Sequence, residues 1–361
     1  MCSSDLNESV GNRVDVRFED GGEVSVKNVA RPIRVWKWRP GDAPTAATAP
    51  AEPPEPDRQS IAVLPFTNMS GDAEQEYFSD GITEDIITDL SKVAGLLVIA
   101  RNSSFAYKGK NTDIRAVGRE LGVRSVLEGS IRRAGNRVRI TAQLIDAANG
   151  GHLWAERYHR DLTDIFAVQD EVTRHIVAAL KVKLAPAEAD HIAEAPTRNL
   201  EAHDLVLRAR DFLTGRVTDR GSFEKVVVLF TRAIELDANY GEAYAGLAMA
   251  QVLNYQNRWT DAANPLEEAS RLAARAIATA AHSPYAHYAA AVAALWTRDL
   301  DRARQEAEIA LALSPNFANG QGVRGLVEVY LGNPLAAVPF LERAIRLDPA
   351  FAQQEIGRAH V

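Results

Sequence analysis

A spacing of 34 residues near the C-terminus limits most strongly what this chain can fold into. A repeat of this length fits one pair of antiparallel helices, and such a pair can bury its apolar face only against neighbouring pairs. The sequence therefore predicts an all-α solenoid over residues 199–354. The identical residues at this spacing are Ala310 and Ala344, Leu313 and Leu347, Pro315 and Pro349, and Phe317 and Phe351.

Small residues recur where paired helices would approach each other closely. They are Gly325, Ala337 and Ala344 in the last unit and Ala291, Ala303 and Ala310 in the unit before it. An earlier junction has Ala238 in place of the proline, and its 46-residue distance to Pro284 predicts a longer loop or helix between them. The pattern resembles the tetratricopeptide repeat (TPR) and predicts about four units, two of them regular.

Stacked helix pairs of this type form a concave groove lined by the first helix of each pair. Aromatic and amide groups on such a groove suit the capture of a protein or peptide partner. Tyr285 and Trp296 could equally be wedges in the core. The residues predicted to line the groove are Tyr285, Tyr288, Trp296, Asn319 and Tyr330.

Residues 60–185 have a different pattern, in which strand and helix signals alternate. The β-branched runs SIAVLPF and LLVIAR predict buried strands, and three alternating segments joined by glycine turns predict antiparallel strands. Apolar residues at helical spacing predict helices over residues 78–93, 114–121 and 166–180. We therefore expect an α/β domain with a mixed sheet and helices packed on it.

An acidic run, FSDGITED, offers a candidate chemical site at Asp80, Glu84 and Asp85. A metal or acid/base site is conceivable there. The favoured interpretation is an acid-rich helical start, because carboxylates near a helix N-terminus interact favourably with its dipole. We expect no catalytic, cofactor-binding or metal-binding residue in this chain.

Two further groups of residues favour structural over chemical roles. His152, His159 and His175 do not fall at metal-ligand spacing, and the only cysteine is Cys2. Four arginines on one predicted hairpin could bind phosphate or RNA, but a solvated sheet edge is favoured because no aromatic residues interleave with them. These arginines are Arg132, Arg133, Arg137 and Arg139.

Charge and hydropathy weigh against two classes of partner. The net charge of −7 provides no general basic field for nucleic acid. No apolar run approaches the roughly 18 residues that a membrane-spanning helix needs. We therefore expect a cytoplasmic protein with no nucleic-acid partner and no membrane span. Residues 39–59, rich in Pro, Ala and acid, predict an extended linker.

Both termini carry sequences that a common sequencing adapter encodes. MCSSDL at residues 1–6 and EIGRAHV at residues 355–361 are translations of that adapter read in opposite senses. We expect both segments to be artefacts and the natural protein to be longer on both sides.

Residues 11–38 predict three short strands, with a turn at Gly21–Gly22. The stretch FEDGGEVSVKNVARPIRVWKW resembles the C-terminal end of a bacterial class III adenylate/guanylate cyclase catalytic domain, with Trp36 at a position where tyrosine is usual. The resemblance implies that residues 7–38 are the closing strands of that domain. Its metal-binding aspartates would precede residue 7, so the two Mg²⁺ ions, the ATP and the dimer contact belong to the missing catalytic domain.

Residues 60–185 resemble the TolB N-terminal-like domain of bacterial regulators, on SIAVLPFTNMSGDAEQEYFSDGITEDIITDL and the segments that follow. That family has no known enzymatic activity and occurs between an effector domain and TPR units. Together the resemblances imply the regulatory, protein-interaction portion of a cyclase that converts ATP to cyclic AMP and pyrophosphate. The alternatives are the regulatory arm of a winged-helix transcriptional regulator and an envelope-associated TolB-like binding protein.

Overall fold

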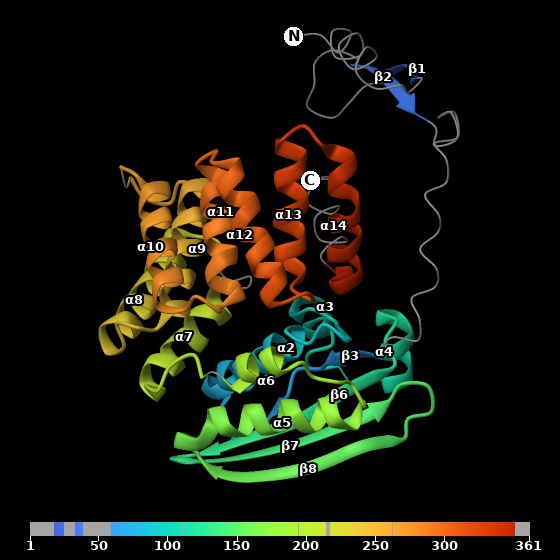
Figure 1. Ribbon diagram of the computed structural model, residues 1–361, viewed down its shortest axis with the longest axis vertical. Coiled ribbons are helices and arrows are strands. Elements are labelled where there is room, and N and C mark those ends of the chain that lie inside the picture. Colours follow the sequence, from blue (N-terminus) through green and yellow to red (C-terminus); the bar gives the residue numbers. More distant parts are fainter. Residues whose placement is uncertain are drawn as a thin grey trace. The chain divides into compact units, whose positions relative to one another are not determined.

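The computed structural model describes residues 18–24, 33–38, 59–110, 112–193, 195–213, 217–261 and 263–350, in two units divided after Asp57 (Figure 1). In the first unit, β1 (Phe18–Val24) pairs antiparallel with β2 (Ile33–Trp38). The predicted turn at Gly21–Gly22 is wrong. Both glycines lie inside β1, where the register shifts between Asp20 and Glu23, as at a β-bulge.

Several sequence predictions fall outside the described residues. They concern the KNVARP motif at 27–32, residues 39–58 of the linker predicted over 39–59, and both terminal segments, 1–6 and 355–361.

The second unit begins with a six-stranded sheet in the order β5-β3-β6-β7-β8, with β4 paired to β6. The central strand β3 runs parallel to β5 and β6, while β6, β7 and β8 form an antiparallel meander. Since β7 pairs on both sides, the arginine-rich β6–β7 hairpin is not the sheet edge that the sequence predicted. The strands are β3 (Gln59–Val63), β4 (Thr67–Asn68), β5 (Leu96–Val98), β6 (Ser125–Ala134), β7 (Arg137–Asp146) and β8 (His152–Asp161).

Alternation along β3 sends its side chains to two different cores. Ile61 and Val63 are buried in the cluster that contains the apolar faces of α2 and α5. Ala62 points to the opposite face, where Val117 of α4 packs. The helices of this domain are α2 (Glu76–Ser91), α3 (Arg101–Phe105), α4 (Ile114–Leu121), α5 (Ile165–Ala179) and α6 (Pro186–Ala193), with 3-10 turns η1 (Ala73–Gln75) and η2 (Leu162–Asp164).

Four helical pairs follow, here called the array, and Figure 1 shows them in succession. Small residues permit the close packing of successive helices: a Cβ added to Gly246 of α9 would lie 2.2 Å from Cζ of Phe230 on α8. The 46-residue spacing reflects a 17-residue α9 and the loop after it, since α11 and α13 have 13 residues. The pairs are α7 (Leu200–Leu213) with α8 (Arg220–Leu236), α9 (Gly241–Asn257) with α10 (Pro265–Thr279), α11 (Pro284–Trp296) with α12 (Leu300–Leu313), and α13 (Ala318–Tyr330) with α14 (Pro334–Leu347).

Candidate functional site

The acidic run of α2 faces the array rather than solvent. Arg210 on α7 places Nη2 2.9 Å from Oδ1 of Asp85 and 3.3 Å from Oε1 of Glu84. Its Nη1 lies 3.4 Å from Oε2 of Glu242, at the start of α9. One guanidinium on α7 therefore binds carboxylates of the sheet domain and of a second array helix, α9.

Burial and pairing set the charge of these groups. Burial alone would raise the pKa of Asp85, but Arg210 and His203 outweigh it and hold that pKa well below its usual range. Burial raises the pKa of Glu242, which Arg210 only partly offsets. Asp85 is thus a fixed anion in an ion pair, not a group ready to exchange protons.

The prediction that these acids mark a helical start is wrong. The helix begins at Glu76, so Asp80, Glu84 and Asp85 lie in its interior. Each has a basic partner: Lys108 lies 2.5 Å from Asp80, and Arg101 lies 3.0 Å from Glu84. Side-chain pairing, rather than the helix dipole, accounts for the acidic run.

Asn316, in the turn between α12 and α13, closes the end of α2. Its side-chain amide donates to the carbonyl oxygens of Val93 at 3.0 Å and Leu96 at 2.6 Å, and its backbone N–H donates to Ser91 at 3.3 Å. Ser91 is the last residue of α2, Val93 lies in the loop that follows, and Leu96 is the first residue of β5. The buried turn of the array thus caps a helix of the sheet domain.

The corresponding turn one repeat later binds the sheet domain again. Asp348 accepts hydrogen bonds from Ser103 at 2.5 Å and Asn102 at 2.9 Å, and the N–H of Ala100 donates to the carbonyl of Leu347 at 2.7 Å. The Leu347 side chain is fully buried in the core beneath β3 and β5. Two successive turns of the array are therefore fixed to the sheet domain.

The predicted groove residues separate into two groups. Tyr285 and Tyr288, near the start of α11, are partly buried, with ring centroids 6.0 Å apart. Tyr288 also meets Phe317 edge-on, and burial raises its pKa to about 12. Asn319 is exposed in the first turn of α13.

Trp296 and Tyr330 lie at the opposite ends of α11 and α13, where they are 37% and 49% exposed. The ring centroids of Trp296 and of Tyr255 on α9 are 6.0 Å apart. The Cζ atom of Arg298 lies 4.9 Å from the centroid of the Tyr330 ring. We call Tyr255, Trp296, Arg298 and Tyr330 the aromatic edge. The 34-residue spacing of Trp296 and Tyr330 indicates that they share a repeat position. Tyr255 and Arg298 were not predicted from the sequence.

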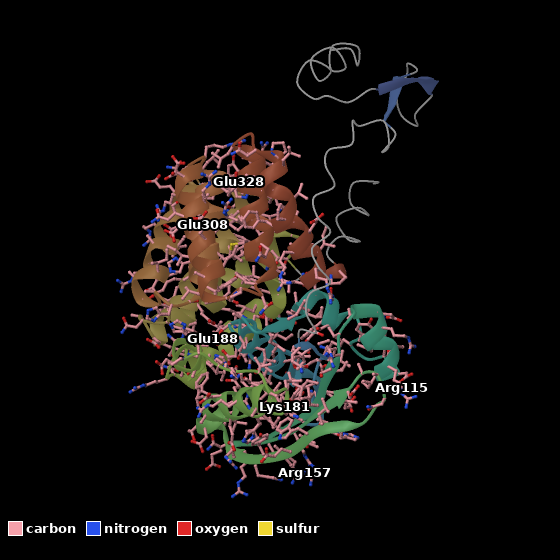
Figure 2. All side chains as sticks on the ribbon, turned by 45° about the vertical axis from the view of Figure 1, so that its right-hand side comes forward. Arg115, Arg157, Lys181, Glu188, Glu308 and Glu328 are labelled. Atoms are coloured by element: carbon pink, nitrogen blue, oxygen red, sulfur yellow. The ribbon has the colours of Figure 1, made fainter. Side chains whose placement is uncertain are left out.

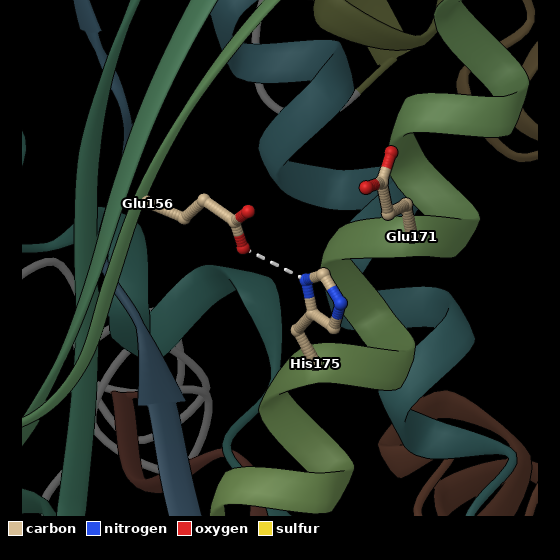
Figure 3. Close-up of side chains that lie close together, drawn as sticks. All are labelled: Glu156, Glu171 and His175. Atoms are coloured by element: carbon tan, nitrogen blue, oxygen red, sulfur yellow. Dashed lines mark ion pairs between the residues drawn. The ribbon is translucent and has the colours of Figure 1, made fainter.

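A third cluster joins α5 to β8 (Figure 3). His175 Nδ1 lies 2.9 Å from Oε2 of Glu156 and 2.9 Å from the hydroxyl of Tyr158, and Glu171 pairs with Arg160 at 3.3 Å. Ligand atoms of Glu156, Glu171 and His175 lie within 4.8 Å of one another, a donor set that suits a divalent metal. The existing hydrogen bonds account for the trio as a link between helix and sheet. Spacing along the chain could not reveal it, because Glu156 comes from another element.

Among the helices that the structure describes, none combines the length and apolar character needed to cross a bilayer.

Three comparisons relate the chain to known proteins. Residues 57–176 match the family model described as "HilA/YgeH-like transcriptional regulator, second domain". Among solved structures, the first TPR of Spaghetti (RPAP3) bound to an HSP90 peptide covers 37% of this chain and 96% of its own, at 15% identity and TM-score 0.30. A crystal structure of MamA covers 54% of this chain and 99% of its own, at 16% identity and TM-score 0.32.

A curated relative is similar over a longer stretch. It is 52% identical to this chain over 305 residues, which are 83% of this chain and 52% of the relative. The chain thus spans about half the length of that relative. Over most of its own length, the chain is similar to a Rhizobium meliloti (strain 1021) protein named "Putative adenylate cyclase 3".

Proposed function

We propose that this chain is the regulatory and protein-interaction portion of a nucleotide cyclase, acting in cyclic nucleotide signalling in the cytoplasm. The 52% identity to a protein named as an adenylate cyclase carries this proposal. In it, a catalytic domain preceding the linker would hold ATP and two Mg²⁺ ions and dimerise, converting ATP to cyclic AMP and pyrophosphate. The TolB-like sheet domain and the array would supply control.

The seat of the array on the sheet domain supports a role in transmission. The stretch over residues 39–58 leads into β3, the strand between β5 and β6. Asn316, Asp348 and Arg210 fix the array to that same domain. Binding of a partner to the array would then change the relative free energies of two arrangements of the catalytic domain. A change of about 1–2 kcal/mol in that difference alters activity several-fold.

The test compares this chain with a longer protein that includes the domain ahead of it. With ATP and Mg²⁺, we expect cyclic AMP from the longer protein and none from this chain. Replacing Trp296 and Tyr330 together by alanine should change the rate of the longer protein in the presence of cell extract, but not its rate when pure. Cyclic AMP production by this chain, or none by the longer protein, would contradict the proposal.

A second candidate function is the control arm of a DNA-binding transcriptional regulator. The match of residues 57–176 to the second domain of such regulators favours it. The resemblance of KNVARPIRVWKW to a cyclase end favours the first candidate instead. Fluorescence anisotropy of the longer protein with labelled duplex DNA distinguishes them, since binding without cyclase activity would support the regulator.

A further inference from the structure

The last helical pair carries an unusual share of exposed apolar surface. Six of the eleven large hydrophobic residues that are exposed in the described part of the chain belong to α13 and α14. We call four of these the end face, and they are 43–48% exposed. The end face consists of Leu326, Val329, Val338 and Ile345.

The counterparts of Leu326 and Val329, one repeat earlier, are buried. Val292 and Leu295 occupy the same positions of α11, and they are 8% and 7% exposed. Both belong to an apolar cluster that includes Val323 and Val327 of α13. At this joint the following helix, α13, therefore covers these positions.

The other two counterparts also contact α13. Arg304, the counterpart of Val338, binds the carboxylate of Glu328 at 3.0 Å, at a joint marked by Glu308 and Glu328 in Figure 2. Leu311, the counterpart of Ile345, lies 3.1 Å from where a Cβ on Gly320 would stand. All four positions thus form the interface between one pair and the next.

We propose that the end face binds a further helical pair of the same 34-residue type, stacked on α13 and α14 as these stack on α11 and α12. The interface that would form continues the one already present between the two pairs. The occupant's first helix carries apolar residues four apart, at the positions that Val323 and Val327 hold in α13. At the position that corresponds to Glu328, the occupant's first helix carries an apolar residue. The end face has Val338 at the position of Arg304, and Val338 offers no charge to pair with a carboxylate.

The test adds such a pair to the full chain after Ala350, in the 34-residue register. The added pair copies α13 and α14, with leucine at the counterpart of Glu328. A matched control carries serine at the counterparts of Val323, Val327 and Glu328. Amide exchange in residues 323–330 of the original α13 should slow by about tenfold with the first pair and stay unchanged with the control. Equal exchange in the two proteins would overturn the proposal.

Sedimentation of the chain without an added pair tests the other occupant, a second copy. We expect a monomer at micromolar concentration. A dimer that Leu326→Glu and Val329→Glu abolish would show that the end face closes on its own copy, and would overturn the proposal. Because both side chains are exposed, these substitutions should leave the melting temperature unchanged, which shows that the variant is folded.

Discussion

At the residue scale, Asn316 shows how one side chain can join two domains. Its amide donates to carbonyls in the loop after α2 and at the start of β5, and Arg343 of α14 donates to its side-chain oxygen at 3.0 Å. The residue is buried, so water cannot replace these bonds. An asparagine that follows a repeat proline would pass in the sequence as an ordinary turn residue.

Replacing Asn316 by alanine should lower the free energy of unfolding by about 1–3 kcal/mol, because it removes a buried amide that donates to Val93 and Leu96 and accepts from Arg343. The matched control is Asn319→Ala, three residues along and exposed, which should change the stability by less than about 0.5 kcal/mol. Urea unfolding followed by circular dichroism measures both. Equal effects from the two substitutions would contradict the role assigned to Asn316.

Asp89 gives the junction a dependence on pH. Burial raises its pKa to about 6 from 3.8, despite a hydrogen bond from Lys92 at 2.8 Å. A carboxyl with a raised folded-state pKa binds its proton more tightly in the folded protein. Its contribution to stability is therefore full below about pH 4 and is lost as the pH rises through about 6.

Asp89→Asn removes this titration. The stability of the wild type relative to the variant should fall by up to about 3 kcal/mol between about pH 4 and pH 8. Urea unfolding of both proteins across this range measures the difference, in which acids remote from Asp89 cancel. A difference that is flat, or that grows toward high pH, would contradict the assignment.

The partners of the acidic run could not be predicted from the sequence. Asp80, Glu84 and Asp85 fall on α2 as the helical spacing indicates, but local pattern does not say what faces a helix. Arg210 comes from the array, 125 residues beyond Asp85. Such a contact depends on how whole elements pack.

At the scale of elements, local periodicity was a good guide. Alternating apolar residues predicted β7 and its neighbours, because each strand buries one face. Strand order carried no such local signal, so the β6–β7 hairpin was wrongly placed at an edge. Gly21–Gly22 misled for a similar reason, since glycine pairs mark bulges as well as turns.

Two glycines of the array differ in the space around them: Gly246 packs closely on a neighbouring helix, whereas Gly322 faces open space. In Gly246→Ala the added methyl would overlap the buried ring of Phe230, which should lower stability by about 1–3 kcal/mol. Gly322→Ala, in α13, meets nothing within 4 Å and should raise stability by about 0.5–1 kcal/mol. Thermal unfolding followed by circular dichroism at 222 nm, in the far-ultraviolet helix band, measures both. Effects of the same sign would contradict the packing described.

At the scale of the whole molecule, the array and the sheet domain share a core and a set of buried bonds. Leu207 of α7 packs with the sheet cluster, and Leu347 of α14 packs beneath β3. The sequence predicted a groove but not that two turns of the array would rest on the sheet domain. The five predicted groove residues lie on α11 and α13, and their binding role stays a prediction.

This shared core predicts that the sheet domain and the array unfold together. Calorimetry of the chain should show one main transition, and amide exchange in β3 and α13 should lose protection at the same urea concentration. Arg210→Ala should move both midpoints downward together, since it leaves buried carboxylates without their cation. Separate transitions for the two parts would contradict this expectation.

The hydrogen bond between Ala100 and Leu347 also affects how the protein responds to a pulling force. Tension applied between Gln59 and Leu347 passes from β3 to the residue after β5 through the bond from the N–H of Ile99 to the carbonyl of Ile61 at 3.0 Å. It then passes through the bond from the N–H of Ala100 to the carbonyl of Leu347 at 2.7 Å. The helices from α7 to α13 lie outside this path. A solenoid without such contacts extends elastically under tension. Here both ends of the array are bonded to the sheet domain, through Arg210 on α7 and Leu347 on α14.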